Sequence, residues 1–339
     1  MPLGPRELLL IVVLPALAAL AILLVGRRAW LRRTRDSSTS LGESDRLNYQ
    51  SPSARRNEIV ATVGAWAGPI ATFVAFAIAF PTIAGTFKIF PPKESMSYLF
   101  IAATVATIGG LLDARAREGA IGLRIAGVFV LAVACTAGVL RFKFKSDWTP
   151  QHASTMIIAI GMLCLTWWLA MDFAERDPAS STAMPWLSWI ISSTIAIVLM
   201  MNGSVKYGEL ALALAAAAGA SVLLTLVAKR RMFLRGSAVV FAIIPALIVI
   251  SAYYLFDLNV LYVSLLLCAP ITIAIGRIIP TEHVRSSVRG ALRIAPTALL
   301  MAVILTIAIR DFRKSQAERD PSDPYGRASE FLDNTPTPG

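Results

Sequence analysis

Apolar positions dominate the chain in runs of about twenty residues, and short polar connections separate these runs. An α-helix of that length crosses a bilayer, because each residue adds about 1.5 Å along a hydrocarbon core of about 30 Å. The pattern predicts an all-α fold, a polytopic membrane bundle of about ten transmembrane helices. The predicted spans are 7–26, 58–83, 97–112, 121–140, 153–172, 184–202, 208–228, 236–255, 258–276 and 290–309.

Two segments are too polar to lie in the bilayer. Residues 27–57 carry an arginine cluster followed by a serine-rich stretch, and we expect them to form a polar loop on the inner side. Residues 311–339 mix charges with prolines, and such a composition cannot bury a core, so we expect a disordered tail. The chain is therefore predicted to be one membrane bundle over residues 1–310, without a soluble domain.

Basic residues orient this bundle. With the N-terminus outside, the inner connections carry most of the 32 lysine and arginine residues. Cytoplasmic connections are rich in these residues, so we predict an outer N-terminus and a first span that is retained as a helix. The inner arginines are expected to contact anionic lipid headgroups, which explains the net charge of +11 without nucleic acid. Helical spans without an organelle address favour a cell membrane, such as a bacterial inner membrane.

Ionisable residues inside a membrane usually mark ion paths or proton relays, and the predicted spans hold few of them. Those present lie near span ends, where we expect them to reach the headgroup region. They are Glu7, Asp113, Arg124, Asp172, Glu209, Asp257 and Arg293. This distribution argues against a pump that couples transport to protons or sodium through buried carboxylates, but it allows a carrier for an apolar substrate.

The sequence contains no motif for catalysis, and we predict no catalytic residue, no metal and no cofactor. The two histidines, His152 and His283, are predicted to lie on opposite faces of the membrane, where they could not share a metal ion. The three cysteines lie in different predicted spans and lack the CxxC spacing of metal or redox sites. The sequence therefore leans away from an enzyme.

One segment invites comparison with an enzyme family. Gly109-Gly110-Leu111-Leu112-Asp113-Ala114-Arg115, at the inner end of the third span, faintly resembles the Gly-Leu-Leu-Asp-Asp segment of polyprenyl-phosphate sugar-1-phosphate transferases. In that family, paired aspartates serve magnesium and diphosphate chemistry. Here Ala114 replaces the second aspartate, and the family's later motifs are missing. The resemblance implies only a weak inner-face candidate at Asp113, and an ordinary helix end explains the same residues.

Small residues predict close packing between helices, because they let backbones approach where water cannot drive association. Gly64 with Gly68, and Ala215 with Gly219, each form a step of small residues four positions apart. We expect contacts within the chain, with a homo-oligomer or a partner subunit as the alternative. Tryptophans near the inner ends of two spans are expected in the headgroup belt: Trp167, Trp168, Trp186 and Trp189.

Prolines and small polar residues mark a candidate substrate path. Pro245 and Pro270 are predicted to kink their helices, and kinked helices can frame a cavity. Ser188 and Ser192 share one face of the sixth span because they are four residues apart, and Asn202 follows at its end. Such residues also hydrogen-bond within their own helix or to a neighbour, and both interpretations stay open.

A short sequence echo suggests an internal repeat. Leu123-Arg124-Ile125-Ala126 recurs as Leu292-Arg293-Ile294-Ala295, and each copy opens a span that ends on basic residues. A duplicated unit with a site between its copies is one explanation. Chance similarity between helices built from Ala, Leu and Ile is the other.

Three functions fit these observations. The first is a carrier or permease-like bundle for a small neutral or lipidic substrate, based on helix number, short connections and kinks. The second is a non-catalytic membrane subunit or scaffold of a larger complex. The third and weakest is a membrane-embedded lipid-linked transferase with Asp113 near its chemistry.

Overall fold

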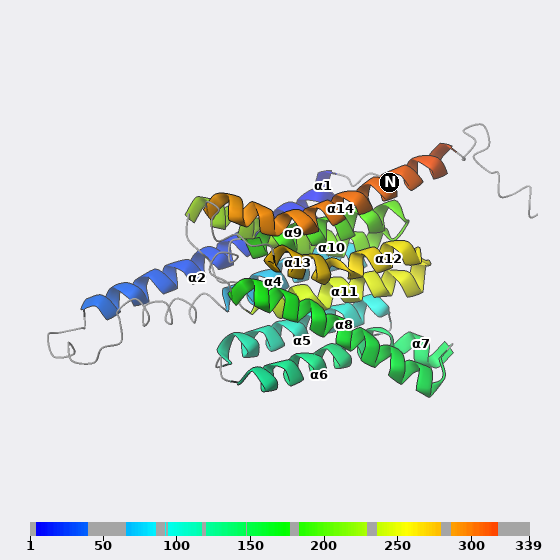
Figure 1. Cartoon of the computed structure of the whole chain (residues 1–339), viewed down its shortest axis with the longest axis horizontal. Coiled ribbons are helices and arrows are strands. Elements are labelled where there is room, and N and C mark those ends of the chain that lie inside the picture. The colour runs from blue at the N-terminus through cyan, green and yellow to red at the C-terminus, as the bar shows by residue number, and fades with distance from the viewer. Residues whose placement is uncertain are drawn as a thin grey trace, which may run out of the picture.

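The computed structural model describes residues 5–39, 66–85, 92, 94–116, 120–146, 148–176, 183–228, 236–278 and 286–317. Within these residues all regular structure is helical, and nine helices are long and apolar enough to cross a membrane. A tenth apolar segment, Val260–Gly276, is shorter and broken. The all-α membrane bundle is therefore confirmed (Figure 1).

The helices follow the predicted spans closely. Apolar runs set their positions, because every buried backbone group of a membrane segment must be paired within a helix. The first span combines α1 (Pro5–Leu8), a π-helical turn (Leu9–Val13) and α2 (Leu14–Thr39). The others are α4 (Ala67–Ala84), α5 (Ser95–Arg115), α6 (Ile121–Val139), α7 (Arg141–Ser146), α8 (Pro150–Arg176), α9 (Ala183–Met201), α10 (Val205–Ala228), α11 (Ser237–Phe256), α12 (Val260–Leu267), α13 (Ala269–Ile278) and α14 (Ser286–Ala317).

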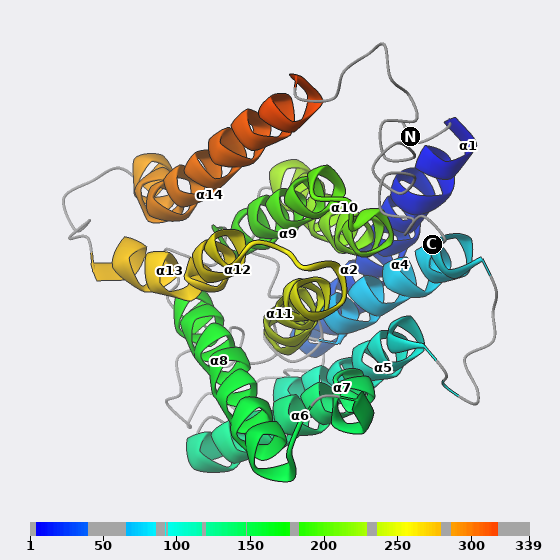
Figure 2. The same cartoon turned by 90° about the vertical axis from the view of Figure 1, so that its right-hand side faces the viewer.

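The central helix of the bundle is α11. It carries no Asp, Glu, Lys, Arg or His, and it is buried along most of its length, as expected for a helix that is apolar on all sides. It contacts α4, α5, α6, α8, α9, α10 and α12. Figure 2 shows α11 in the middle of the bundle, with α14 and the α1–α2 helix at the periphery.

Two helices extend beyond their predicted ends. α2 continues to Thr39, so the first part of the predicted polar loop is helical. No Gly or Pro interrupts residues 27–39, and Ala, Leu and Arg favour a helix. In Figure 1 this part of α2 extends beyond the bundle. α14 continues to Ala317, past the predicted start of the tail, and residues 318–339 lie outside the described part.

The predicted continuous span 258–276 is instead broken at Cys268 into α12 and α13. Pro270 explains the break, because its ring lacks the N–H that would bond to the Leu266 carbonyl and would clash with that carbonyl. The Cys268 N–H closes α12 by donating to the Ser264 and Leu265 carbonyls. A kink was predicted at this proline, and the structure has a discontinuous helix.

The two echoed segments begin helices that run in the same direction on opposite sides of α11 (Figures 1 and 2). Each helix packs against the preceding one through a glycine. A Cβ on Gly109 of α5 would meet the Leu131 side chain of α6, and a Cβ on Gly276 of α13 would meet the Arg293 carbonyl of α14. Both explanations of the echo remain compatible with this arrangement.

Candidate functional site

A buried arginine joins three helices at one end of the bundle. Arg124 lies in the first turn of α6, Asp113 in the last turn of α5, and Asp172 four residues before the end of α8. α5 and α8 end where α6 begins, so the helix directions bring the three side chains together. We call this part of the bundle the Arg124 end.

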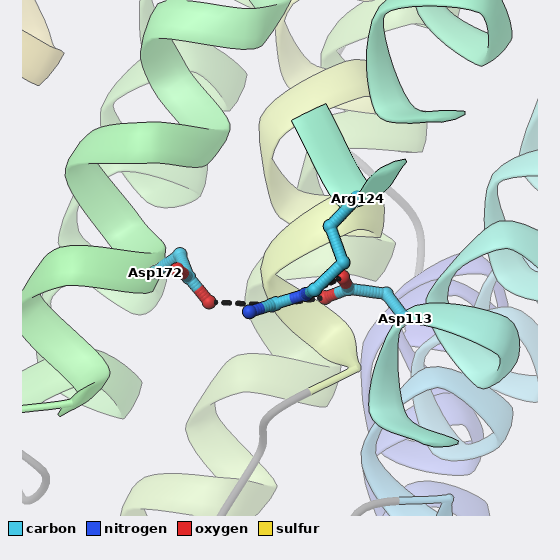
Figure 3. Close-up of polar contacts among 3 residues, drawn as sticks. All are labelled: Asp113, Arg124 and Asp172. Atoms are coloured by element: carbon cyan, nitrogen blue, oxygen red, sulfur yellow. Dashed lines mark hydrogen bonds and ion pairs between the residues drawn. The ribbon is translucent and has the colours of Figure 1, made fainter. Parts of the chain in front are cut away.

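The geometry is that of a strong charge-assisted network (Figure 3). Arg124 binds Asp113 in a bidentate manner, with Nε donating to Oδ1 at 2.7 Å and Nη2 to Oδ2 at 3.1 Å. The same Nη2 donates to Oδ1 of Asp172 at 2.7 Å. One guanidinium therefore ties α6 to both α5 and α8.

The network is closed off from its surroundings. The side chain of Arg124 is 1% exposed, that of Asp113 3% and that of Asp172 4%. The guanidinium lies over the ring of Trp168, with Cζ 5.3 Å from the ring centroid. Glu175, one turn beyond Asp172 on α8, is also buried. Such a cluster is costly to form unless every charge is paired, so its members depend on each other.

The guanidinium retains donor capacity. An arginine has five N–H groups, and those on Nε and Nη2 point to the two carboxylates. Nη1 is buried and has no hydrogen-bond partner among the described residues. A buried unsatisfied donor of this kind is rare in native proteins and usually has a water, an ion or a functional role as its explanation.

These positions correct one prediction. Asp113, Arg124 and Asp172 were expected to reach the headgroup region, but they turn inward and pair with one another. The argument against ion coupling relied on spans without buried charge, so it loses its premise. The signal was present in the sequence, since two acidic residues and one basic residue lie at span ends on the same predicted face. Only the tertiary neighbours could decide between snorkelling and pairing.

The predicted path residues do not form one group. Ser188 and Ser192 are both buried on α9, and Oγ of Ser192 has no hydrogen-bond partner in the described part of the chain. Asn202 follows the end of α9, ten residues from Ser192 or roughly 15 Å along a helix, and its side-chain amide donates to the Val198 carbonyl. Pro245 is buried inside α11, and Pro270 is buried at the start of α13.

Two tryptophans also differ from expectation. Trp167 and Trp168 were predicted in the headgroup belt, but they are 1% and 0% exposed and belong to the core. Trp167 Nε1 donates to the Leu267 carbonyl at the end of α12, close to the break in that span. Trp168 forms one wall of the Arg124 network. Both residues therefore support the site from within the bundle.

The structure describes three of the four residues in the predicted small-residue steps. Ala215 is buried in α10, and a Cβ on Gly219 would lie 3.3 Å from the Trp189 ring of α9, so this step packs within the chain. Gly68 is buried at the start of α4, where its carbonyl accepts from Thr72. Gly64 lies outside the described residues.

Asp113 was the candidate for lipid-linked transfer chemistry. Both of its carboxylate oxygens accept hydrogen bonds from Arg124, so they are occupied by a fixed cation. The described residues contain no group of three or more His, Cys, Asp or Glu side chains that could hold a metal ion. Asp113 therefore acts in this structure as a partner of Arg124.

Comparisons with known proteins find no matching family, no matching curated protein and no matching solved structure. The site must be interpreted from its own geometry.

Proposed function

We propose that this multi-pass membrane protein is a carrier for a small neutral or lipidic solute, and that the Arg124 network seals one end of its path. The observation that carries the proposal is the buried Arg124–Asp113–Asp172 network inside three membrane helices. Charged side chains within membrane spans are expensive, and where they occur they usually line or control a path for a substrate or an ion.

A network of this kind suits a seal that opens and closes. When it is formed, each charge is compensated by its partners. When α8 moves away from α6, water can solvate the separated charges, so the open arrangement also has a favourable environment. Opening breaks the single hydrogen bond from Arg124 to Asp172, whereas the bidentate pair with Asp113 keeps α5 and α6 together.

The broken span supports the same proposal. Discontinuous helices in carriers place backbone groups inside the membrane, where they bind substrates and coupling ions. α12 and α13 break at Cys268, beside the buried Pro270, and the end of α12 is held to α8 by the Trp167 hydrogen bond. This hydrogen bond connects the break to the helix that carries Asp172.

The distribution of basic residues orients the proposed carrier. We propose that the Arg124 end faces the cytoplasm, because the arginines of residues 27–35 extend α2 at that end of the bundle. The network would then be the inner seal of a carrier in a cell membrane, and the arginines beyond it would contact anionic headgroups.

A distance measurement tests the carrier proposal. Leu123 and Phe173 flank Arg124 and Asp172, and both are exposed on the outside of the bundle, at 76% and 44%. Spin labels on Leu123→Cys and Phe173→Cys, in a variant without the native cysteines and in lipid nanodiscs, report the α6–α8 separation by pulsed electron resonance. A carrier is expected to give two distances, one closed and one open.

The variant Asp172→Asn should shift this equilibrium toward the open distance by about tenfold, which corresponds to about 1.4 kcal/mol. It removes one charge of the α6–α8 tie but leaves Arg124 and Asp113 as a neutral pair, so the fold should persist. Arg141→Ala is the matched control, because this exposed arginine bonds only weakly to Tyr98, at 3.3 Å. A single distance that Asp172→Asn leaves unchanged would contradict the proposal and favour a static scaffold.

A further inference from the structure

We infer that the Arg124 end binds the carbonyl oxygen of an uncharged, amide-like solute, and that Nη1 of Arg124 and Nε1 of Trp168 donate hydrogen bonds to it. The inference rests on the proposed carrier function and names the class of solute that the carrier would take. It depends on two enclosed N–H groups, which the tie between Arg124, Asp113 and Asp172 does not use.

Two donors at the Arg124 end are buried without an acceptor. Arg124 is 4% exposed and Trp168 is 0% exposed. Nη1 of the first and Nε1 of the second have no hydrogen-bond partner in the described part of the chain. The guanidinium lies over the Trp168 ring, with Cζ 5.3 Å from the ring centroid, so both donors belong to one place in the bundle. Because unpaired buried donors are costly, an acceptor from outside the chain would be bound favourably there.

Asp113 supplies acceptors at the same place. Its Oδ1 accepts one hydrogen bond from Nε of Arg124, and its Oδ2 accepts one from Nη2. A carboxylate oxygen has two lone pairs, so each of these oxygens has the capacity for a further hydrogen bond. Figure 3 shows the guanidinium held between Asp113 and Asp172. The cluster therefore offers both N–H donors and carboxylate acceptors to one bound solute.

The charges of the cluster favour an uncharged solute. An anion would lie beside the carboxylates of Asp113 and Asp172, which repel it. A cation would lie beside the Arg124 guanidinium, and it has no lone pair for the two unpaired donors. A carbonyl oxygen can accept from both donors, and an N–H of the same solute can donate to Asp113. Primary amides and ureas combine these groups without a net charge.

The Leu123–Phe173 spin-label pair tests this inference when acetamide is titrated as the probe. The two donors are enclosed in the closed arrangement, so a solute reaches them when the Arg124 end opens. The ratio of open to closed molecules should about double when the acetamide concentration equals its dissociation constant, and it should keep rising beyond that point. Acetate and acetamidinium have the same shape but carry opposite charges, and both should leave the ratio unchanged.

Trp168→Phe identifies the donor. Phenylalanine keeps an aromatic ring beside the guanidinium but lacks the indole N–H, so the dissociation constant for acetamide should rise about fivefold, the effect of one hydrogen bond. Two distances in the absence of acetamide show that the variant keeps its fold. Trp189→Phe is the matched control, since this tryptophan of α9 is 40% exposed and lies outside the cluster, and it should respond as the wild type does.

Three results would overturn the inference while two distances keep the carrier proposal intact. The first is a ratio that acetamide does not change, which would mean that the donors bind ordered water only. The second is an equal response to acetamide, acetate and acetamidinium. The third is a Trp168→Phe titration that follows the wild type. A single distance at every acetamide concentration would contradict the carrier proposal itself, and the inference with it.

Discussion

The helices of the α9–α10 pair and those of the α5–α6–α8 group are held together by different kinds of contact. α9 and α10 meet through small residues, and a Cβ on Gly208 would lie 2.6 Å from Cγ of Met200 and 2.9 Å from the Ala196 carbonyl oxygen. α9 has no charged residue, and those of α10 are confined to its first turns. α5, α6 and α8 are instead tied by three charges, each on a different helix.

The difference indicates which contacts are permanent. Backbones in close contact have no equally good alternative, because separation would leave a void that neither lipid nor water fills well. A charged network does have an alternative, since water can solvate its members once the helices part. We therefore interpret α9–α10 as a fixed part of the bundle and the Arg124 network as the part that can change.

The largest expected effect comes from removing the cation. Arg124→Ala removes the cation that pairs with the buried carboxylates of Asp113 and Asp172, and it should lower the free energy of unfolding by about 3–5 kcal/mol. Unfolding of the purified protein by denaturing detergent measures this change. Arg141→Ala, an exposed arginine, should change stability by about 0–1 kcal/mol. Equal stabilities for the two variants would contradict the central role of Arg124.

A smaller loss of stability is expected when a side chain is added at the close contact between α9 and α10. Gly208→Ala places a methyl group against the backbone of α9 and should cost about 1–3 kcal/mol. Gly127→Ala makes the same change on α6, where a Cβ meets nothing within 4 Å, so it should stabilise the protein slightly through helix propensity. If both alanine variants unfold like the wild type, α9 and α10 are not in close contact.

The smallest effect concerns a neutral polar contact between helices. Oγ1 of Thr272 on α13 and Oγ1 of Thr297 on α14 are hydrogen-bonded at 3.1 Å, and Thr297 is fully buried. The Thr272 hydroxyl also lies 2.8 Å from the Ala269 carbonyl of its own helix. Thr272→Val should cost only about 0.6 kcal/mol, the average for such contacts in membranes. Thr306→Val is the control, because this exposed threonine donates to the Ala302 carbonyl of its own helix. If Thr272→Val lowered the free energy of unfolding as much as Arg124→Ala does, the distinction between charged and neutral contacts would be contradicted.

The fold could be predicted from the sequence because hydropathy acts locally. Long apolar runs place α4, α5, α6 and α8 to α11 within a few residues of their predicted ends, and the predicted start of α4 lies outside the described residues. The short basic helix α7 lies in a predicted connection. The break at Cys268 was harder to predict from the sequence, since a proline in a span can either kink or interrupt the helix. The observed break depends on how α12 and α13 pack against their neighbours.

The candidate site could be predicted only in part. Asp113 was identified from its position at a helix end, but its partner was not, because an arginine at a span end can equally extend to the headgroups. Whether Arg124 pairs inward depends on the directions of α5, α6 and α8 and on their mutual contacts. The candidates Ser188 and Ser192 are both buried on α9, and a substrate path along them stays a prediction.

The most direct test measures both regions in one experiment. Spin labels on Leu123→Cys and Phe173→Cys report the Arg124 network, and labels on Ile197→Cys and Leu223→Cys, both exposed, report the α9–α10 pair. We predict two distances for the first pair, with Asp172→Asn enriching the longer one, and a single distance for the second pair in both backgrounds. A single, unchanged distance for the first pair would contradict the claim that the Arg124 network opens and closes.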